Sequence, residues 1–486
     1  MKLQSYLNQQ GIHGHRYKLI HGNLKDMDRS LRQALSQPIN LTHKIPSRVL
    51  PFLDQTIKSY GKTSITWVGT CPRLNIMDPE LVREVMSTKF GHFARPEQRP
   101  QTKLLLTGLV GYDGEKWVRH RRILNPAFHQ EKLKRMVPVM FTCWIEVISK
   151  WEKLIGSKNS SEIDVWPELQ DATADVIART GFSTNYKDGM RIFHLQREQA
   201  ELVIKATQTI YVPGFSYLPT KDNIRRKEIN IEVESMLTEM IEKRKKAMEM
   251  GDAVEDDMLT VMVEAYLKES QESGDSKSMG LTFDEVLDEC KLFFFAGHET
   301  TSVLLTFTMI VLSMHPDWQE KAREEVLQVF GKNKPHLDGL NHLKIVTMII
   351  FEVLRLYPPA VLPIRRTYKE VKLGEYRLPP GVQLSIPLIF IHHDPELWGE
   401  DVDEFKPERF SEGFAKAANH QLAFFPFGWG PQICIGQNFT MLEAKLALAM
   451  ILQRFSFELS PSYVHAPCVI ITLMPQHGAQ VIIHRL

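Results

Sequence analysis

The chain has 486 residues, of which 43% are hydrophobic and 24% are charged. This is the composition of a globular protein, and it excludes a disordered or collagen-like chain. The 59 Lys and Arg residues balance the 58 Asp and Glu residues to a formal charge of +1, which gives no electrostatic reason to expect nucleic acid as a partner.

The first ten residues are polar and lack the apolar core of a signal peptide or membrane anchor. Apolar runs elsewhere, such as 446–452, are shorter than the ~18–20 residues that cross a bilayer. We therefore expect no membrane-spanning segment, although the protein can still lie on a membrane surface. The five cysteines are scattered without a C-x-x-C pair, which argues against a disulfide framework or a cysteine zinc site.

A charged helical region is predicted over about 223–250, and a Ser- and Gly-rich stretch follows at 268–280. We interpret this stretch as a surface loop within one domain, with a domain boundary as the alternative. Thr282 and Glu285 then form a capping box, and nothing interrupts the helical pattern before Pro316. The helix from 282 to 315 would be roughly 50 Å long. Because it is mostly apolar, it should cross the protein interior.

Two more helices are predicted, one over the apolar repeat from Val346 to Tyr357 and one after Gly436. Short β-like stretches at 370–378 and 382–387 lie between them, separated by a Pro-Pro-Gly turn. The predicted fold is mainly α with a minor β-sheet region, in a single large domain over 1–486.

The stretch from Phe427 to Gly436 reads F-G-W-G-P-Q-I-C-I-G, so a lone cysteine lies at the start of a predicted helix. A helix N-terminus lowers the pKa of a thiol and donates hydrogen bonds to the thiolate. Gly436 leaves space for a flat cofactor, and Phe427 can shield the sulfur from water. We therefore predict that Cys434 is the thiolate ligand of a haem iron rather than a buried structural cysteine.

This stretch resembles the haem-binding signature of the cytochrome P450 family, and the resemblance extends over essentially the whole chain. Four other family motifs have counterparts in the expected order, namely Trp117-x-x-x-Arg121, Ala296-Gly-His-Glu-Thr300, Glu352-x-x-Arg355 and Pro407-Glu-Arg409-Phe410. The resemblance implies the P450 fold, in which haem b (iron protoporphyrin IX) is buried between the long central helix and the cysteine loop.

Three shorter stretches resemble the plant branch of secologanin synthase-like enzymes, known as family 72. They are D-V-W-P at 164–167, F-P-F-G-W-G at 425–430 and P-Q-H-G at 475–478. The family generally carries an N-terminal membrane anchor, and this sequence begins where that anchor would end. The resemblance implies a protein on the cytosolic face of the endoplasmic reticulum membrane.

The resemblance also assigns roles to individual residues. It implies iron ligation by Cys434 and haem contacts by Trp117, Arg121, Ala296, Gly297, Arg366, Phe427, Gly430 and Gly436. Thr300 and Glu299 would direct protons during oxygen activation, although Thr300 could instead bond to its own helix and Glu299 could pair with a neighbouring base. Glu352, Arg355 and Arg409 would form a structural charge cluster.

Gln432 departs from the family pattern, which usually has an arginine there that pairs with a haem propionate. A neutral amide cannot supply a charge-assisted pair. We expect haem to bind nonetheless, through the remaining anchors.

The predicted function is a monooxygenase that inserts one oxygen atom of O2 into a lipophilic, terpenoid-derived plant metabolite. No flavin or nicotinamide fingerprint is present, so the resemblance implies an NADPH–cytochrome P450 reductase as the electron donor. The alternatives are a haem-thiolate isomerase or dehydratase that needs no external electrons, and a non-catalytic haem sensor or carrier. Val361, Leu362 and residues 293–295 are expected to line an apolar pocket. Basic residues between 119 and 135 would form a reductase docking face or, alternatively, a solvated helix face.

Overall fold

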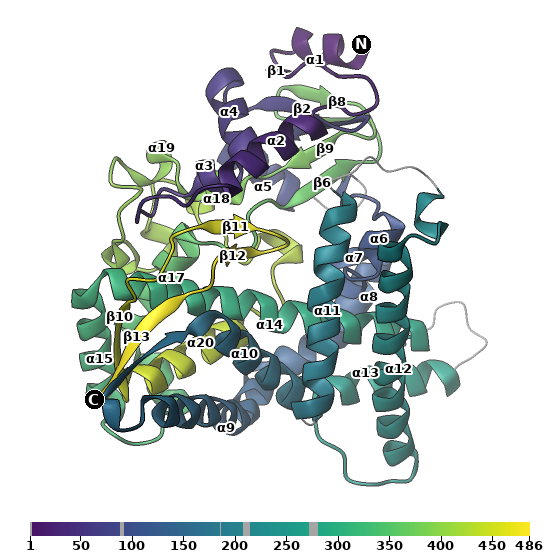
Figure 1. Cartoon of the computed structure of the whole chain (residues 1–486). Helices are drawn as coiled ribbons and strands as arrows, with labels where there is room; N and C mark the ends of the chain where they lie inside the picture. The colour runs from purple at the N-terminus through teal and green to yellow at the C-terminus, as the bar shows by residue number, and fades with distance from the viewer. Residues whose placement is uncertain (1, 88–91, 185, 208–213, 272–279) are drawn as a thin grey trace.

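A long central helix, α14 (Phe283–Met314), crosses the middle of the molecule (Figure 1). The predicted capping box is present, because the side chains of Thr282 and Glu285 each accept the other's amide, and the helix ends just before Pro316. By length and composition α14 could cross a membrane, but 78% of its most apolar window is buried. As predicted, it is a core helix.

The structure, a computed structural model, describes all residues except 1, 88–91, 185, 208–213 and 272–279. The other helices are α1 (Lys2–Gln9), α2 (Leu24–Leu35), α3 (Pro46–Val49), α4 (Pro51–Tyr60), α5 (Pro79–Ser87), α6 (Pro100–Lys103), α7 (Gly108–Gly111), α8 (Gly114–Leu124), α9 (Gln130–Ile155), α10 (Val165–Phe182), α11 (Tyr186–Thr207), α12 (Lys221–Glu249), α13 (Met258–Gln271), α15 (Pro316–Phe330), α16 (Leu337–His342), α17 (Lys344–Leu356), α18 (Leu388–His392), α19 (Pro395–Trp398) and α20 (Gln437–Leu452).

The strands form one larger sheet and three small ones, which confirms the mainly α class with a minor β region. Their bounds are β1 (His13–Gly14), β2 (Ser64–Val68), β3 (Cys71–Asn75), β4 (Phe93–Ala94), β5 (Ser160–Asp164), β6 (Ile364–Thr367), β7 (Val371–Leu373), β8 (Tyr376–Leu378), β9 (Gln383–Ser385), β10 (Phe455–Leu459), β11 (Pro467–Val469), β12 (Leu473–Pro475) and β13 (Gln480–Arg485). The larger sheet has the order β1-β2-β3-β9-β6-β4 and lies near the N-terminus in Figure 1. The predicted strand 370–378 is the β7–β8 hairpin, which turns at Gly374 with a φ of 54°.

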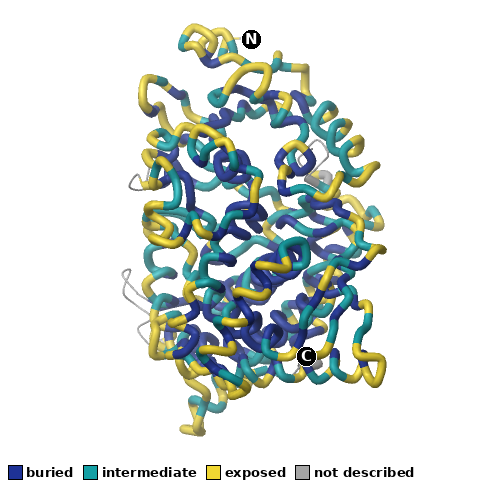
Figure 2. The backbone as a smooth tube through the Cα atoms, turned by 90° about the vertical axis from the view of Figure 1, so that its left-hand side faces the viewer, coloured by how far each residue is buried: buried dark blue, intermediate teal, exposed yellow. Residues whose placement is uncertain are grey.

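One hydrophobic core runs through the molecule, with buried backbone inside and exposed backbone around the rim (Figure 2). Its members range from Leu7, near the N-terminus, to Ile483, near the C-terminus, so the chain folds as one domain. Of the predicted loop at 268–280, the first residues belong to α13, and residues 272–279 lie outside the described part of the chain.

The N-terminal segment is tied to the end of α14 by two histidines. His43 Nε2 lies 2.9 Å from His315 Nε2, and His43 Nδ1 lies 2.9 Å from the hydroxyl of Tyr357. Burial, reinforced by the neighbouring His315, lowers the pKa of His43 from 6.5 to about 3. His43 is therefore neutral in the folded protein across the physiological range.

This pairing predicts acid lability. Between pH 6.5 and about 3 the unfolded chain binds a proton at His43 that the folded chain does not, so the free energy of unfolding falls as the pH falls through this window. We expect His43→Gln to reduce the slope of unfolding free energy against pH by up to about 1.4 kcal/mol per pH unit. Urea unfolding at several pH values measures the slope, and an unchanged slope would contradict the assignment.

Candidate active site

Cys434 lies three residues before Gln437, the first residue of α20, at the positive end of that helix. The amides of Gly436 and Gln437 donate hydrogen bonds to its sulfur, and its own amide donates to the Phe427 carbonyl at 2.8 Å. Burial raises the pKa of the Cys434 thiol. The two amide hydrogen bonds and the positive charge of Arg121 lower this pKa, but by less, so the net shift is upward. The helix N-terminus alone thus does not produce the lowered pKa that the sequence predicted. A bound iron ion would supply the difference, because a coordinating thiol is deprotonated outright.

The loop that carries Cys434 has the shape that a flat cofactor requires. Among the described residues, a Cβ on Gly436 would meet only the Cys434 sulfur, at 3.9 Å, so no described side chain fills the space beside Gly436. The Cys434 side chain is exposed to solvent, although the protein atoms around it partly desolvate the sulfur. Gly430 has a φ of 72°, and a Cβ there would come within 2.5 Å of the Met86 carbonyl oxygen, so this position needs a glycine to contact α5.

Three arginines concentrate positive charge beside this loop. Arg121 of α8 donates from Nη1 to the Ile433 carbonyl at 2.7 Å, next to the cysteine. Burial lowers the pKa of Arg121 and Arg365, and that of Arg95 to about 10. Asp113 is the carboxylate that Arg95 and Arg365 share. Buried cations require counter-anions, and the two propionates of haem b fit this excess of positive charge.

Of the two arginines of β6, Arg365 is the one that contacts the cysteine loop directly, and the predicted haem contact of Arg366 stays a prediction. Arg365 Nη2 donates to Gln432 Oε1 at 3.0 Å, and Gln432 Nε2 donates to Asp113 Oδ1 at 3.1 Å. Arg366 lies 3.6 Å from Glu97 in a partly exposed ion pair. Successive side chains of a strand point to opposite faces of the sheet, so Arg365 and Arg366 lie on opposite faces of β6. Gln432 therefore bridges a cation and an anion.

Across from the loop, α14 presents Ala296 and Thr300 on one face. The Thr300 hydroxyl donates to the Ala296 carbonyl at 3.0 Å, which is the alternative that the sequence left open, and its oxygen can still accept a hydrogen bond. Gly297 does not border open space, because a Cβ there would lie 2.8 Å from Cγ1 of Ile177 on α10. This glycine allows the close approach of α10 and α14, and its predicted haem contact stays a prediction.

The Glu299 carboxylate is nearly buried and is held by a residue that the sequence did not indicate. Its side chain is 14% exposed, and its Oε1 accepts a hydrogen bond from Thr472 Oγ1 at 2.7 Å. Thr472 lies in the β11–β12 turn, 173 positions away in the chain. No local pattern marks a contact of such long range. Likewise, nothing in the sequence around Arg95 singles it out.

The predicted structural cluster is assembled as expected at the end of α17. Glu352 and Arg355 are fully buried and joined by two hydrogen bonds of 2.7 Å. Arg355 also donates to the carbonyls of His392 and Val402, and Arg409 Nε lies 3.6 Å from Glu352 Oε1. The cluster therefore fixes the backbone between His392 and Arg409, which precedes the cysteine loop in the chain.

A small apolar cluster lies beside Ala296. Its buried members are Leu105, Ala200, Val203 and Phe295, with Leu106 and Ile471 packed against them. Phe295 is the only one of the three predicted phenylalanines in this cluster, since Phe293 and Phe294 belong to the main core. The predicted Val361 and Leu362 also contact the main core.

Comparison with known proteins matches a family model described as Cytochrome P450 over residues 41–482. The chain belongs to the cytochrome P450 family. "Cytochrome P450 CYP72A616" of Paris polyphylla is 60% identical over 486 residues, covering 100% of this chain and 94% of the relative. The "7-deoxyloganic acid hydroxylase" of Catharanthus roseus is 48% identical over 489 residues, with 100% and 94% covered. These relatives place this P450 in the plant CYP72 group, as predicted.

A solved structure described as "Retinoic acid bound cyanobacterial CYP120A1" shares the fold. Its TM-score is 0.76 at 23% identity, over 90% of this chain and 94% of that one. Family and fold together confirm haem as the cofactor and monooxygenase as the enzyme class. P450 enzymes in general use O2, an organic substrate and a redox partner, and the relative named as a hydroxylase favours a monooxygenase over the isomerase and sensor alternatives.

Most of the basic run between 119 and 135 makes contacts within this P450. Arg119 donates to Glu285 at 2.5 Å, and Arg121 faces the cysteine loop. Lys132 and Arg135 both form ion pairs with Asp256. These pairs favour the helix-face interpretation over a dedicated docking surface.

The two adjacent arginines of β6 form a matched pair for testing haem retention. Arg365→Ala removes the cation at the cysteine loop, and hydrogen bonds to charged groups contribute about 1.5–3 kcal/mol. We expect haem to transfer to apomyoglobin about tenfold faster or more from this variant. Arg366→Ala should transfer haem at the wild-type rate. A greater effect of Arg366→Ala than of Arg365→Ala would contradict the assignment.

Proposed function

We propose that this P450 hydroxylates a lipophilic, terpenoid-derived plant metabolite, with electrons from NADPH–cytochrome P450 reductase at the cytosolic face of the endoplasmic reticulum membrane. The observation that carries the proposal is the accessible Cys434 sulfur, bonded by two α20 amides, beside the open space at Gly436. In the overall reaction, substrate, O2, NADPH and a proton give hydroxylated substrate, water and NADP+.

The residues of the site have two roles: one set would bind the haem, and the other would transfer protons. Haem with a thiolate ligand supplies the oxygen activation that inserts an oxygen atom into a C–H bond. Cys434 would ligate the iron, while Trp117, Arg121 and Arg365 would help to hold the haem. The Thr300 hydroxyl and the Glu299 carboxylate, adjacent on α14, can pass protons from solvent toward the face of Ala296.

The substrate class is proposed from the apolar cluster and from the relatives. The cluster around Phe295 brings apolar side chains together from four separate parts of the chain, and such a lining suits a bulky lipophilic molecule. One relative is described as hydroxylating 7-deoxyloganic acid, a terpenoid-derived acid. Iridoids, triterpenoids, gibberellins and brassinosteroid-like sterols are therefore the compounds to test.

Turnover with isotopically labelled O2 tests the proposal. The P450, reconstituted with the reductase and NADPH, should convert 7-deoxyloganic acid or a member of a triterpenoid, gibberellin and sterol panel to a product with one labelled oxygen atom. Cys434→Ala should form no product and should lose the carbon monoxide absorbance band for which the family is named. The proposal fails if the wild type forms only unlabelled or rearranged products, or if Cys434→Ala keeps the band.

Thr300→Ala should separate oxygen activation from binding. General acid–base groups contribute about 10²–10⁴-fold to rates, so we expect product per NADPH to fall about tenfold or more and hydrogen peroxide to rise in step. Because the substitution leaves the cysteine loop intact, the carbon monoxide band should not change. Unaltered product per NADPH would remove Thr300 from the proton path.

A further inference from the structure

The Glu299 carboxylate has a single hydrogen-bond donor in the described part of the chain. That donor is the Thr472 hydroxyl, 2.7 Å from Oε1, and Thr472 is only 6% exposed. A hydroxyl bonded to a carboxylate at this distance makes a short, charge-assisted hydrogen bond. Shielding from water strengthens the bond and limits its exchange with solvent.

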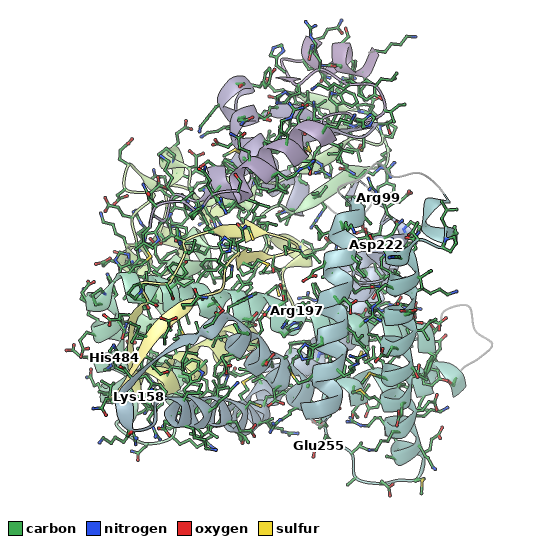
Figure 3. All side chains as sticks on the ribbon, in the orientation of Figure 1. Arg99, Lys158, Arg197, Asp222, Glu255 and His484 are labelled. Carbon is green, nitrogen blue, oxygen red and sulfur yellow. The ribbon has the colours of Figure 1, made fainter. Side chains whose placement is uncertain are left out.

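The other carboxylate oxygen faces a nitrogen that has no proton to donate. Glu299 Oε2 lies 3.8 Å from His298 Nε2, while His298 Nδ1 lies 2.7 Å from the Phe294 carbonyl, an acceptor that requires the proton on Nδ1. Burial lowers the pKa of His298, and Arg197, on the side of α11 toward α10 and α14 in Figure 3, lowers it further against the opposing effect of Glu299. The imidazole is therefore neutral, with a lone pair on Nε2.

Thr472 is held in place by the backbone of its own turn. The Ile470 amide donates to the Thr472 carbonyl at 3.2 Å, and the Leu473 amide donates to the Pro359 carbonyl at 3.0 Å. The preceding residue, Ile471, packs against the apolar cluster around Phe295. The turn thus reaches α14 at two neighbouring points, the apolar cluster and the Glu299 carboxylate.

We propose that Thr472 is a positioning residue for oxygen activation: its hydroxyl orients the Glu299 carboxylate so that the acid can pass protons toward Thr300. The inference rests on the proposed function, because it assigns Glu299 to the proton path. Without the hydroxyl, Glu299 would rotate freely beside the lone pair of His298 Nε2, and its proton would reach the haem side less often.

The test uses the holoenzyme with reductase and NADPH and no organic substrate. Under these conditions O2 is reduced to one of two products. Two electrons and two protons give hydrogen peroxide, and four electrons and four protons give two water molecules. Poor proton delivery favours hydrogen peroxide. The measured quantity is hydrogen peroxide formed per NADPH oxidised, which requires no knowledge of the natural substrate.

Thr472→Val removes the hydroxyl and keeps the shape of the side chain. A hydrogen bond contributes about 0.5–1.5 kcal/mol, so we expect the ratio of peroxide to water to rise about two- to tenfold. Thr472→Ser keeps the hydroxyl and should restore a value near the wild type. Thr308→Val is the matched control, because the Thr308 hydroxyl bonds to the Leu304 carbonyl of its own helix at 2.7 Å. Its ratio should equal that of the wild type.

The inference is overturned if Thr472→Val matches the wild type, or if Thr472→Ser is as impaired as Thr472→Val, since the latter would show a packing role. The carbon monoxide band and the urea midpoint of each variant establish that the fold and the thiolate are intact. Wild-type NADPH oxidation with the reductase is measured first, so it tests the proposed function separately from the role of Thr472.

Discussion

The placement of one sulfur atom at the start of α20 is the constraint on which the rest of the site depends. Two backbone amides direct hydrogen bonds at Cys434, and they can do so only while the preceding loop keeps its turn. The segment that precedes this loop is fixed by Arg355, which is fully buried and bonded both to Glu352 and to the carbonyls of His392 and Val402. Breaking such a pair leaves an uncompensated buried charge, which costs about 3–5 kcal/mol.

The positive charge beside the cysteine loop is arranged differently from the family pattern. Gln432 replaces the usual arginine. Its side chain accepts a hydrogen bond from Arg365 and donates one to Asp113. An amide has both a donor and an acceptor, so it can link a cation to an anion without adding charge. Arg95 and Arg365 then supply the buried positive charge that the loop itself lacks.

Much of this architecture could be predicted from local sequence. The capping box at Thr282 and the stop at Pro316 define α14 to within one residue at each end, because caps and prolines act on adjacent backbone groups. The position of Cys434 before α20 follows from the same short-range logic. Both features depend only on neighbours in the chain.

The features that could not be predicted depend on contacts between distant segments. The choice between Arg365 and Arg366 depends on which face of β6 meets the loop, and a strand of four residues carries too little pattern to show it. The net pKa of the Cys434 thiol depends on how deeply the whole fold buries it. The bond from Thr472 to Glu299 joins residues that no local motif relates.

The contact between Gly297 and Ile177 has a consequence for the evolution of this group. A methyl group at 297 would lie 2.8 Å from Cγ1 and 3.4 Å from Cβ of Ile177. Because a β-branched side chain in a helix has one strongly preferred χ1 rotamer, moving Cγ1 away is costly. Substitutions at positions 297 and 177 are therefore coupled. Lineages that acquire alanine at 297 should also carry alanine or glycine at 177, because valine keeps the γ carbon that the added methyl group would meet, so the pair should covary across P450 sequences even though only one member lies in a recognised motif.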